Sequence, residues 1–515
     1  MLSLSLVDLK MALFLWQSLF CVLPSLLLLG LLLLVRRPVV RAWTRRTLGA
    51  VGWTLWRGLC LILHLPLDKK TPPGTNVSLS TGTEFMCKPS TLAQYLLCNC
   101  GALSRTTLAS WPKGDPHLQT VLGLLCGPHA SGVQFTRDHL LLKDGGIVAL
   151  DWATGRAVCD PGVRNSRPPV LLLVPEHWGG LSPHLRSLCY TATAQGFYVV
   201  VFHHRGTAGC PLTTTRLTEF GDPADLEQAV AYIHTRHPSS ALLAVSEGSG
   251  SGTLLSFLGE RGSSSRVTAA AAISPVLLGQ VWFETALPPL YHWGVLHHRK
   301  QQLRRYASSF RRVLEVDQVF KSSSLKEFEE RLFCKHKSEA PWGLSPSVAW
   351  ELKDRAHPTA DWDSYWERNE PLRDADEVAV PVLCILSRDD PLLPPVCALP
   401  LSLFQNNPFF MLVLTETGGH CGFSVQTETS HQSEDINWSH VAVMEYFKVV
   451  VEFLKGGEKD EGFWFGPSGD QRNRTNTFAP VRKRRAGGMR RPQNQTIHQS
   501  LDETEEFTWK RSYTR

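Results

Sequence analysis

The sequence lacks a regular pattern of cysteines. Thirteen cysteines occur among 515 residues, an odd number, and no two of them form a C-x-x-C pair. The closest two, in CNC at 98–100, match neither a zinc knuckle nor a redox motif. Cysteines such as Cys384 lie in strand-like apolar runs, so we expect reduced core residues rather than a disulfide scaffold. Reduced thiols favour a body that faces the cytosol.

The sequence also lacks an internal repeat and a large excess of one charge. Charged residues make up 19%, apolar residues 43%, and the net charge is +6, values that fit a globular protein with a membrane-facing segment. The length allows two average domains or one large α/β domain with appendages. Arginines gather in RRPVVRAWTRR after the first apolar run and in VRKRRAGGMRR near the end. Each cluster is either a solvated flank or a binding surface. We expect no nucleic-acid partner, no metal and no cofactor.

Residues 1–70 are predicted to form a membrane anchor and an interfacial segment. Residues 11–35 carry no charge and exceed the roughly 20 apolar residues that span a bilayer. A cleaved signal peptide is the alternative, but the run is long and arginines follow it where a cleavage site would lie. These arginines place the body in the cytosol, with the endoplasmic reticulum as the expected membrane. The stretch 47–67, with Arg57 in its middle, fits a helix lying on the membrane or a buried helix of the folded domain.

Four N-x-S/T sequons favour the secretory pathway instead. They lie at Asn76, Asn437, Asn473 and Asn494, and a lumenal or secreted protein would be glycosylated there. Because such short motifs also arise by chance, the sequence leaves their use open.

The central part of the chain is typical of a parallel α/β sheet. Short apolar runs alternate with helical patterns from about 110 to 455, and six of the runs are continuous enough for strands covered on both faces. These are 169–175, 196–206, 241–246, 268–274, 380–387 and 409–415. Between the fourth and fifth runs we expect a helical lid, at about 279–370. Residues 71–110 are expected to be a linker, and the polar, basic residues 456–515 a disordered tail.

Five motifs in this region occur in the order found in AB hydrolase family 4, which comprises membrane-anchored esterases and lipases, and the chain resembles that family. The motifs are WPKGDPHLQT (111–120), DGG…LDW (144–152), HHRGTAGCPL (203–212), FGDPADLEQAVAYI (220–233) and TGGHCGF (417–423). The resemblance implies an α/β-hydrolase fold over 111–455, with a mainly parallel central sheet, a helical lid insertion and an N-terminal membrane anchor.

The resemblance also implies a charge-relay pair. The family's histidine falls on His420, in a glycine-rich loop beyond the last strand. The acid falls in SRDDPLLPP, where the family spacing to a following proline, here Pro394, selects Asp390 over Asp389. An ordinary Asp-Asp-Pro turn is the plain alternative.

The oxyanion turn is expected at His177, with Ser249 as its second member, and it departs from the family pattern. Where the family has Pro-Gly and an apolar residue, this chain has Pro175, Glu176 and His177. A carboxylate at Glu176 would oppose the negative charge that an oxyanion hole must stabilise.

The nucleophile position is expected to be glycine. The stretch AVSEGSGSG (244–252) resembles the strand–turn–helix elbow of G-x-S-x-G hydrolases. In the family the nucleophile lies ten residues after a proline, here Pro238, and eleven before the glycine that ends the next helical run, here Gly259. Both counts reach Gly248. Ser246 is the fallback nucleophile, although it requires two residues lost before the turn and two gained after it.

Three functions remain compatible with these residues. The first is a hydrolase-fold protein with impaired catalysis that binds a membrane lipid or acyl ligand in the lid pocket and regulates lipid metabolism. The second is an active membrane carboxylesterase or lipase that uses Ser246, Asp390 and His420. The third, compatible with the first, gives the C-terminal tail a role in binding a protein partner or anionic lipid.

Overall fold

The computed structural model describes residues 38–66, 83–104, 108–125, 133–154, 168–177, 179–334, 343–425 and 437–457. The membrane span predicted at 11–35 and all but the first two residues of the predicted tail lie outside these ranges. Three of the four sequons, at Asn76, Asn473 and Asn494, also lie outside them.

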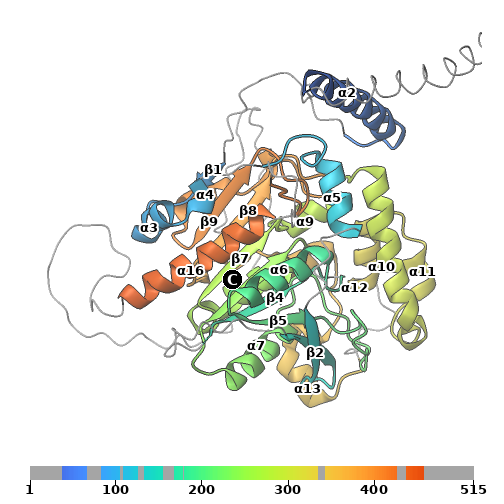
Figure 1. Ribbon diagram of the computed structural model, residues 1–515. Coiled ribbons are helices and arrows are strands. Elements are labelled where there is room, and N and C mark those ends of the chain that lie inside the picture. The colour runs from blue at the N-terminus through green and yellow to red at the C-terminus, as the bar shows by residue number, and fades with distance from the viewer. Residues whose placement is uncertain are drawn as a thin grey trace, which may run out of the picture.

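A nine-stranded sheet organises the described residues (Figure 1), in the order β1-β9-β8-β7-β6-β4-β5-β3-β2. Neighbouring strands from β9 to β5 run parallel, whereas β3 is antiparallel to both β5 and β2, and β1 is antiparallel to β9. The strands are β1 (Glu84–Met86), β2 (Gln134–Leu141), β3 (Ile147–Thr154), β4 (Val170–Val174), β5 (Tyr198–His203), β6 (Leu242–Glu247), β7 (Ala269–Ile273), β8 (Val382–Ser387) and β9 (Phe410–Thr415). Each of the six predicted apolar runs forms one of the strands β4 to β9. The edge strands β1 and β2, and β3 next to β2, were not predicted.

Helices cover both faces of the sheet, which explains the continuous apolar runs. One face packs against α3 (Thr91–Asn99), α6 (Pro183–Ala194) and α16 (Trp438–Gly457), and α6 and α16 cross in front of the sheet in Figure 1. The other face packs against α7 (Ala224–Arg236), α8 (Gly250–Arg261) and α15 (Leu401–Asn406). Because successive strand residues point to opposite faces, Ala244 belongs to the second core and Val245 to the first. Cys384 is a fully buried core residue of β8, and the ten cysteines that the structure describes are all free.

The region expected to form a lid consists of helices. They are α9 (Gly279–Glu284), α10 (Pro289–Phe310), α11 (Val316–Phe320), α12 (Leu325–Phe333), α13 (Pro346–Leu352), the 3-10 helix η2 (Lys353–Ala356) and α14 (Trp362–Asn369). A separate core of aromatic and aliphatic side chains holds them together, and Phe220 from the body of the domain is part of it. The lid therefore has its own packing and an apolar contact with the sheet domain.

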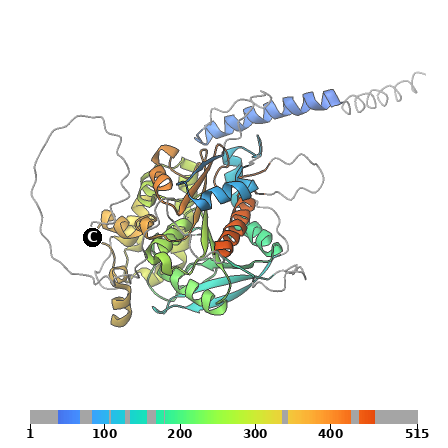
Figure 2. The same cartoon turned by 90° about the vertical axis from the view of Figure 1, so that its left-hand side faces the viewer.

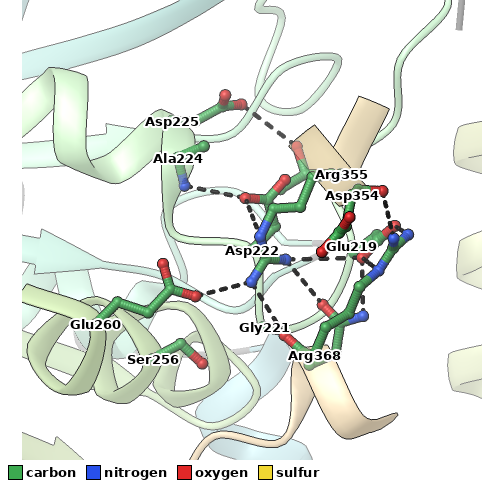
Figure 3. A network of polar contacts seen from close by, with 12 residues as sticks. Glu219, Gly221, Asp222, Ala224, Asp225, Ser256, Glu260, Asp354, Arg355 and Arg368 are labelled. Atoms are coloured by element: carbon green, nitrogen blue, oxygen red, sulfur yellow. Dashed lines mark hydrogen bonds and ion pairs between the residues drawn. The ribbon is translucent and has the colours of Figure 1, made fainter. Parts of the chain in front are cut away.

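A network of buried ion pairs fixes this lid to the sheet domain (Figure 3). Arg355 of η2 lies 2.9 Å from Glu260 of α8 and 3.7 Å from both Asp222 and Glu219, while Arg368 of α14 binds both carboxylate oxygens of Glu219 through Nε and Nη2. Burial disfavours the charged form of Asp222, but the nearby arginines outweigh it and hold the pKa of this carboxyl well below its usual range. The motif FGDPADLEQ thus supplies Asp222 to this network, next to Glu219, which directly precedes the motif.

Helix α2 (Pro38–Ile62) extends along the outside of the body, as Figures 1 and 2 show. Leu48, Leu55 and Ile62 are 71–75% exposed, so the alternative of a buried helix at 47–67 is wrong. The domain contacts α2 from its middle to its end: Gly52 lies against Trp111, and Cys60 is buried together with Leu65, which follows the helix. Within the described ranges, no helix is both long and apolar enough to cross a bilayer.

The remaining short helices connect these layers. They are α4 (Gly101–Ser104), α5 (Pro116–Leu125), η1 (Gly262–Ser264), η3 (Ala375–Glu377) and η4 (Val396–Ala398).

Candidate active site

The chain turns sharply between β6 and α8, at Gly248. Its φ is +50°, a conformation that glycine adopts without a Cβ clash. Its N–H donates to the Ile273 carbonyl at 3.0 Å. Gly250, at the start of α8, has no space for a side chain, because a Cβ there would lie 2.2 Å from the Pro175 carbonyl oxygen. The structure therefore has the crowded geometry of a nucleophile elbow, with glycine as the turn residue.

The glycine used to count back to this position does not end the following helix. Gly259 lies inside α8, which continues to Arg261. A Cβ at Gly259 would lie 2.8 Å from the Asp374 carbonyl oxygen, so the position is small because of close packing. The two counts still converge on the turn residue.

His420 and Asp390 come together from the loops after β9 and β8. His420 Nδ1 lies 2.9 Å from an Asp390 carboxylate oxygen, and the other oxygen of Asp390 accepts the Leu392 N–H. Asp389 instead accepts the Gly419 N–H at 2.9 Å. The structure thus brings His420 together with Asp390 and gives Asp389 a backbone role.

The electrostatics of His420 favour its charged form. Burial works against the imidazolium, but the carboxylate of Asp390 attracts its charge and accepts its N–H, so the pKa of His420 is held well above its usual range. A general base must be neutral to accept a proton. The direction of this shift favours the imidazolium, the form that cannot accept a proton.

Glu176 occupies the space where a nucleophile would lie. Its carboxylate oxygen Oε1 is 3.7 Å from His420 Nε2, the nitrogen on the far side of the ring from Asp390. A Cβ built on Gly248 would lie 3.1 Å from His420 Nε2 and 3.2 Å from Glu176 Oε1. The imidazole therefore lies between two carboxylates, and the second one replaces the hydroxyl of a hydrolase triad.

One of the two expected oxyanion donors is already bonded to the side chain of the other residue. The backbone N–H of His177 donates to the Ser249 hydroxyl at 3.1 Å. Ser249 lies directly before α8 with helical backbone angles and is buried. The structure thus brings His177 and Ser249 together, but the His177 N–H that would face an oxyanion already has an acceptor.

The other serines of the elbow are enclosed. Ser246 is fully buried in β6 between Val174 and Ala272, and its hydroxyl has no hydrogen-bond partner among the described residues. By the alternation of the strand it points to the face covered by α7 and α8. Ser251 donates to the Gly248 carbonyl at 2.8 Å and accepts the Val276 N–H at 2.9 Å, so it holds the turn.

A buried polar cluster behind the elbow was not found from the sequence. Glu247 accepts the Ser182 hydroxyl at 2.8 Å and lies 3.0 Å from His184 Nδ1. Burial opposes the charge of Glu247, but these two hydrogen bonds lower its pKa overall. The only sequence signal for this cluster was Glu247, a carboxylate at the end of an apolar strand run.

The sequon at Asn437 belongs to the same cluster. Its amide nitrogen lies 2.7 Å from His184 Nε2 and donates to the carbonyls of Gly422 and Cys421, while its oxygen accepts the Ser439 hydroxyl. Because glycans attach to this nitrogen, the amide is already committed to internal contacts in the folded protein.

A pocket lies between the oxyanion turn and the lid. Both ring nitrogens of His204, in the turn after β5, are buried and lack a hydrogen-bond partner within the described part of the chain. Burial lowers the pKa of His204 to about 4, so the ring is neutral. The pocket is mixed in polarity and is lined by His177, His204, Arg299, Leu303, Phe310 and Phe333, among others.

Comparison with known proteins identifies clear sequence relatives. No family model matches the chain. Human protein ABHD15 is 44% identical over 445 residues, which cover 85% of this chain and 86% of that protein. Mouse phospholipase ABHD3 is 28% identical over 56% of this chain and 67% of its own length, and zebrafish (Danio rerio) monoacylglycerol lipase ABHD2 is 21% identical over 73% and 87%.

Among solved structures, the esterase Pf2001 of Pyrococcus furiosus covers 68% of this chain and 95% of its own. Its sequence is 13% identical, and the TM-score is 0.35.

Proposed function

The chain belongs to the α/β-hydrolase family of human protein ABHD15, and from this premise we propose that it is a membrane-associated hydrolase-fold protein without esterase activity. In this proposal it binds a lipid or acyl ligand in the lid pocket and acts as a regulatory protein of lipid metabolism.

The observation that carries the proposal is the occupied space above Gly248. The nucleophile position has no hydroxyl, and a Glu176 carboxylate oxygen lies 3.2 Å from where its Cβ would be. The charge-relay pair is present, yet the raised pKa of His420 favours its charged form. Activation of a nucleophile requires a hydroxyl within hydrogen-bond reach of a neutral base. The hydroxyl is missing, and the charge balance around the base works against proton uptake.

The proposed ligand site rests on the pocket beside this blocked centre. Neutral His204 and the apolar side chains of Leu303 and Phe310 line it. A pocket with apolar walls and a few buried polar groups is typical of small-molecule sites. An acyl chain with a polar end fits such a pocket, because the chain would contact the apolar walls and the polar end the buried polar groups.

The proposed membrane association rests on α2. Its exposed leucines would be solvated in water, and a helix with a large exposed apolar surface typically lies in a membrane interface. The residues of the predicted anchor and of the partner-binding tail lie outside the described ranges, so their roles stay predictions.

Labelling with a fluorophosphonate probe tests the absence of esterase chemistry. We expect the purified wild type to resist the probe and to hydrolyse model esters no faster than His420→Ala. Stoichiometric labelling at Ser246, lost in Ser246→Ala, would establish the alternative of an active esterase and overturn the proposal. A related serine hydrolase, labelled in parallel, serves as the positive control.

A further inference from the structure

The lid helix α10 is unusually basic. Residues 289–314 contain six arginines and lysines, three histidines and no aspartate or glutamate. The nearest acidic residues along the chain are Glu284 before it and Glu315 after it. A segment of this length with one sign of charge is a candidate binding surface.

Four of these arginines lie on one exposed side of the helix and the turn after it. Leu296, Leu303 and Phe310 recur every seven residues, about two turns, and are buried against the lid core. The residues that follow them by one and two positions are all exposed. They are His297, His298, Arg304, Arg305, Arg311 and Arg312, the last two lying in the turn directly after the helix, and we call them the cationic face.

The arginines of the cationic face have no acidic partner within the described ranges. No ion pair joins Arg304, Arg305, Arg311 or Arg312 to a carboxylate there, and Arg304 packs over the ring of Phe320. Many other arginines of the domain are paired, as Arg355 is with three acids. The positive charge of this face is therefore available to an external anion.

The same helix is joined to the exposed apolar helix α2. Tyr291, at the start of α10, packs with Cys60 and Leu65 near the end of α2. His117 bridges the two segments, with Nδ1 3.0 Å from the Tyr291 hydroxyl and Nε2 2.9 Å from the Pro66 carbonyl. Trp293, one turn into α10, is 65% exposed. The start of α10 thus lies against the end of α2, and Trp293 stacks on His297 of the cationic face.

We propose that the cationic face of α10 docks on the surface of an anionic lipid bilayer. The proposal rests on the membrane association proposed above and adds a lipid charge and an orientation to it. Clustered arginines beside an amphipathic helix favour anionic headgroups, by roughly fivefold in affinity per arginine. The exposed leucines of α2 and the exposed Trp293 favour a bilayer as the partner. A bilayer can bury these apolar side chains, whereas an acidic peptide cannot.

This orientation places the lid pocket next to the membrane. The buried side of α10 contributes Arg299, Leu303 and Phe310 to the pocket lining, while the opposite side carries the cationic face. Docking through α10 would therefore leave a single helix between the pocket and the headgroups.

Vesicle binding of the full chain tests the proposal. We expect backbone hydrogen exchange in α10 to slow on vesicles of phosphatidylcholine with about 30% phosphatidylserine, but not on phosphatidylcholine alone. Arg304→Gln/Arg305→Gln should reduce the preference for the phosphatidylserine vesicles by roughly 25-fold. Lys448→Gln/Lys455→Gln on α16, across the sheet from the lid, removes the same charge and should leave the preference unchanged. High salt should weaken the preference by screening.

The outcomes separate the two proposals. Equal binding to both vesicles with no change of exchange in α10 overturns the cationic-face proposal while the membrane association stands. Failure to bind either vesicle removes both. In a third outcome, α10 is protected from hydrogen exchange without vesicles and loses this protection when the chain is truncated after residue 457. The acidic end of the tail then covers the cationic face, and the lipid proposal is wrong.

Discussion

Restoring a serine at the elbow should not restore the enzyme unless Glu176 is also removed. In Gly248→Ser the new side chain must enter a space bounded by His420 Nε2 at 3.1 Å and Glu176 Oε1 at 3.2 Å from its Cβ. The φ of +50° adds strain of about 1–3 kcal/mol for a non-glycine residue. We therefore expect a folded but less stable protein that resists fluorophosphonate.

The double variant Glu176→Gly/Gly248→Ser removes the obstacle and frees Nε2 of His420 to contact the hydroxyl. We expect fluorophosphonate to label it, with the introduced serine as the modified residue. Because a neutral base is required and the pKa of His420 lies well above its usual range, the labelling rate should rise as the pH increases above neutrality. Turnover of esters should stay low, because the His177 N–H is already bound to Ser249.

Two control variants separate the causes. Gly248→Ala carries the same Cβ and the same strain without a hydroxyl, so it should match Gly248→Ser in stability and show no labelling. Glu176→Gln/Gly248→Ser keeps the bulk of residue 176 and removes its charge, so labelling there would show that charge rather than space is the obstacle. Rapid labelling of Gly248→Ser alone would refute the reasoning. A folded Glu176→Gly/Gly248→Ser variant that resists the probe would refute it as well.

Three further predictions concern stability and modification. Asp390→Asn should lower the free energy of unfolding by about 3–5 kcal/mol. Since the folded-state pKa of His420 is raised, this loss should be complete below about pH 6.5 and should shrink as the pH passes the raised pKa. A loss that does not depend on pH in denaturant titrations would contradict the prediction. Arg355→Met should lower unfolding stability by about 1.5–3 kcal/mol and speed exchange in α14, because it removes one arginine from a partly buried network while Glu219 keeps Arg368 and Asp222 keeps Arg216. Lys143→Gln, which breaks an exposed pair, should cost less than about 1 kcal/mol; equal effects would show that the Arg355 network does not hold the lid. Mass spectrometry of the folded protein should find Asn437 without a glycan, even after the protein is targeted to the secretory pathway. A glycan on Asn437 would show that the buried contacts of its amide are absent when the sugar is added.

The sequence by itself determined the central strands and the alignment of the site. Six continuous apolar runs predicted β4 to β9 because both faces of these strands are buried. The resemblance to AB hydrolase family 4 implied Asp390 rather than Asp389 and Gly248 as the turn residue, because intervals between strand, turn and helix within a family survive changes of side chain. The hairpin of β2 and β3 was missed, although it contains the turn signal Asp144-Gly145. β2 has no fully buried residue, and the apolar run of β3 ends after four residues, at Asp151.

Only the tertiary structure decided what lies around the elbow. The sequence identified Glu176 as an unfavourable residue in an oxyanion turn, but its position 3.7 Å from His420 depends on how the loops after β4 and β9 pack together. The burial of Ser246, the capture of the His177 N–H by Ser249 and the internal bonds of Asn437 likewise join segments far apart in the chain. Local patterns specify which strands and turns form; distances between separate loops come from packing against a common sheet, and no local pattern encodes them.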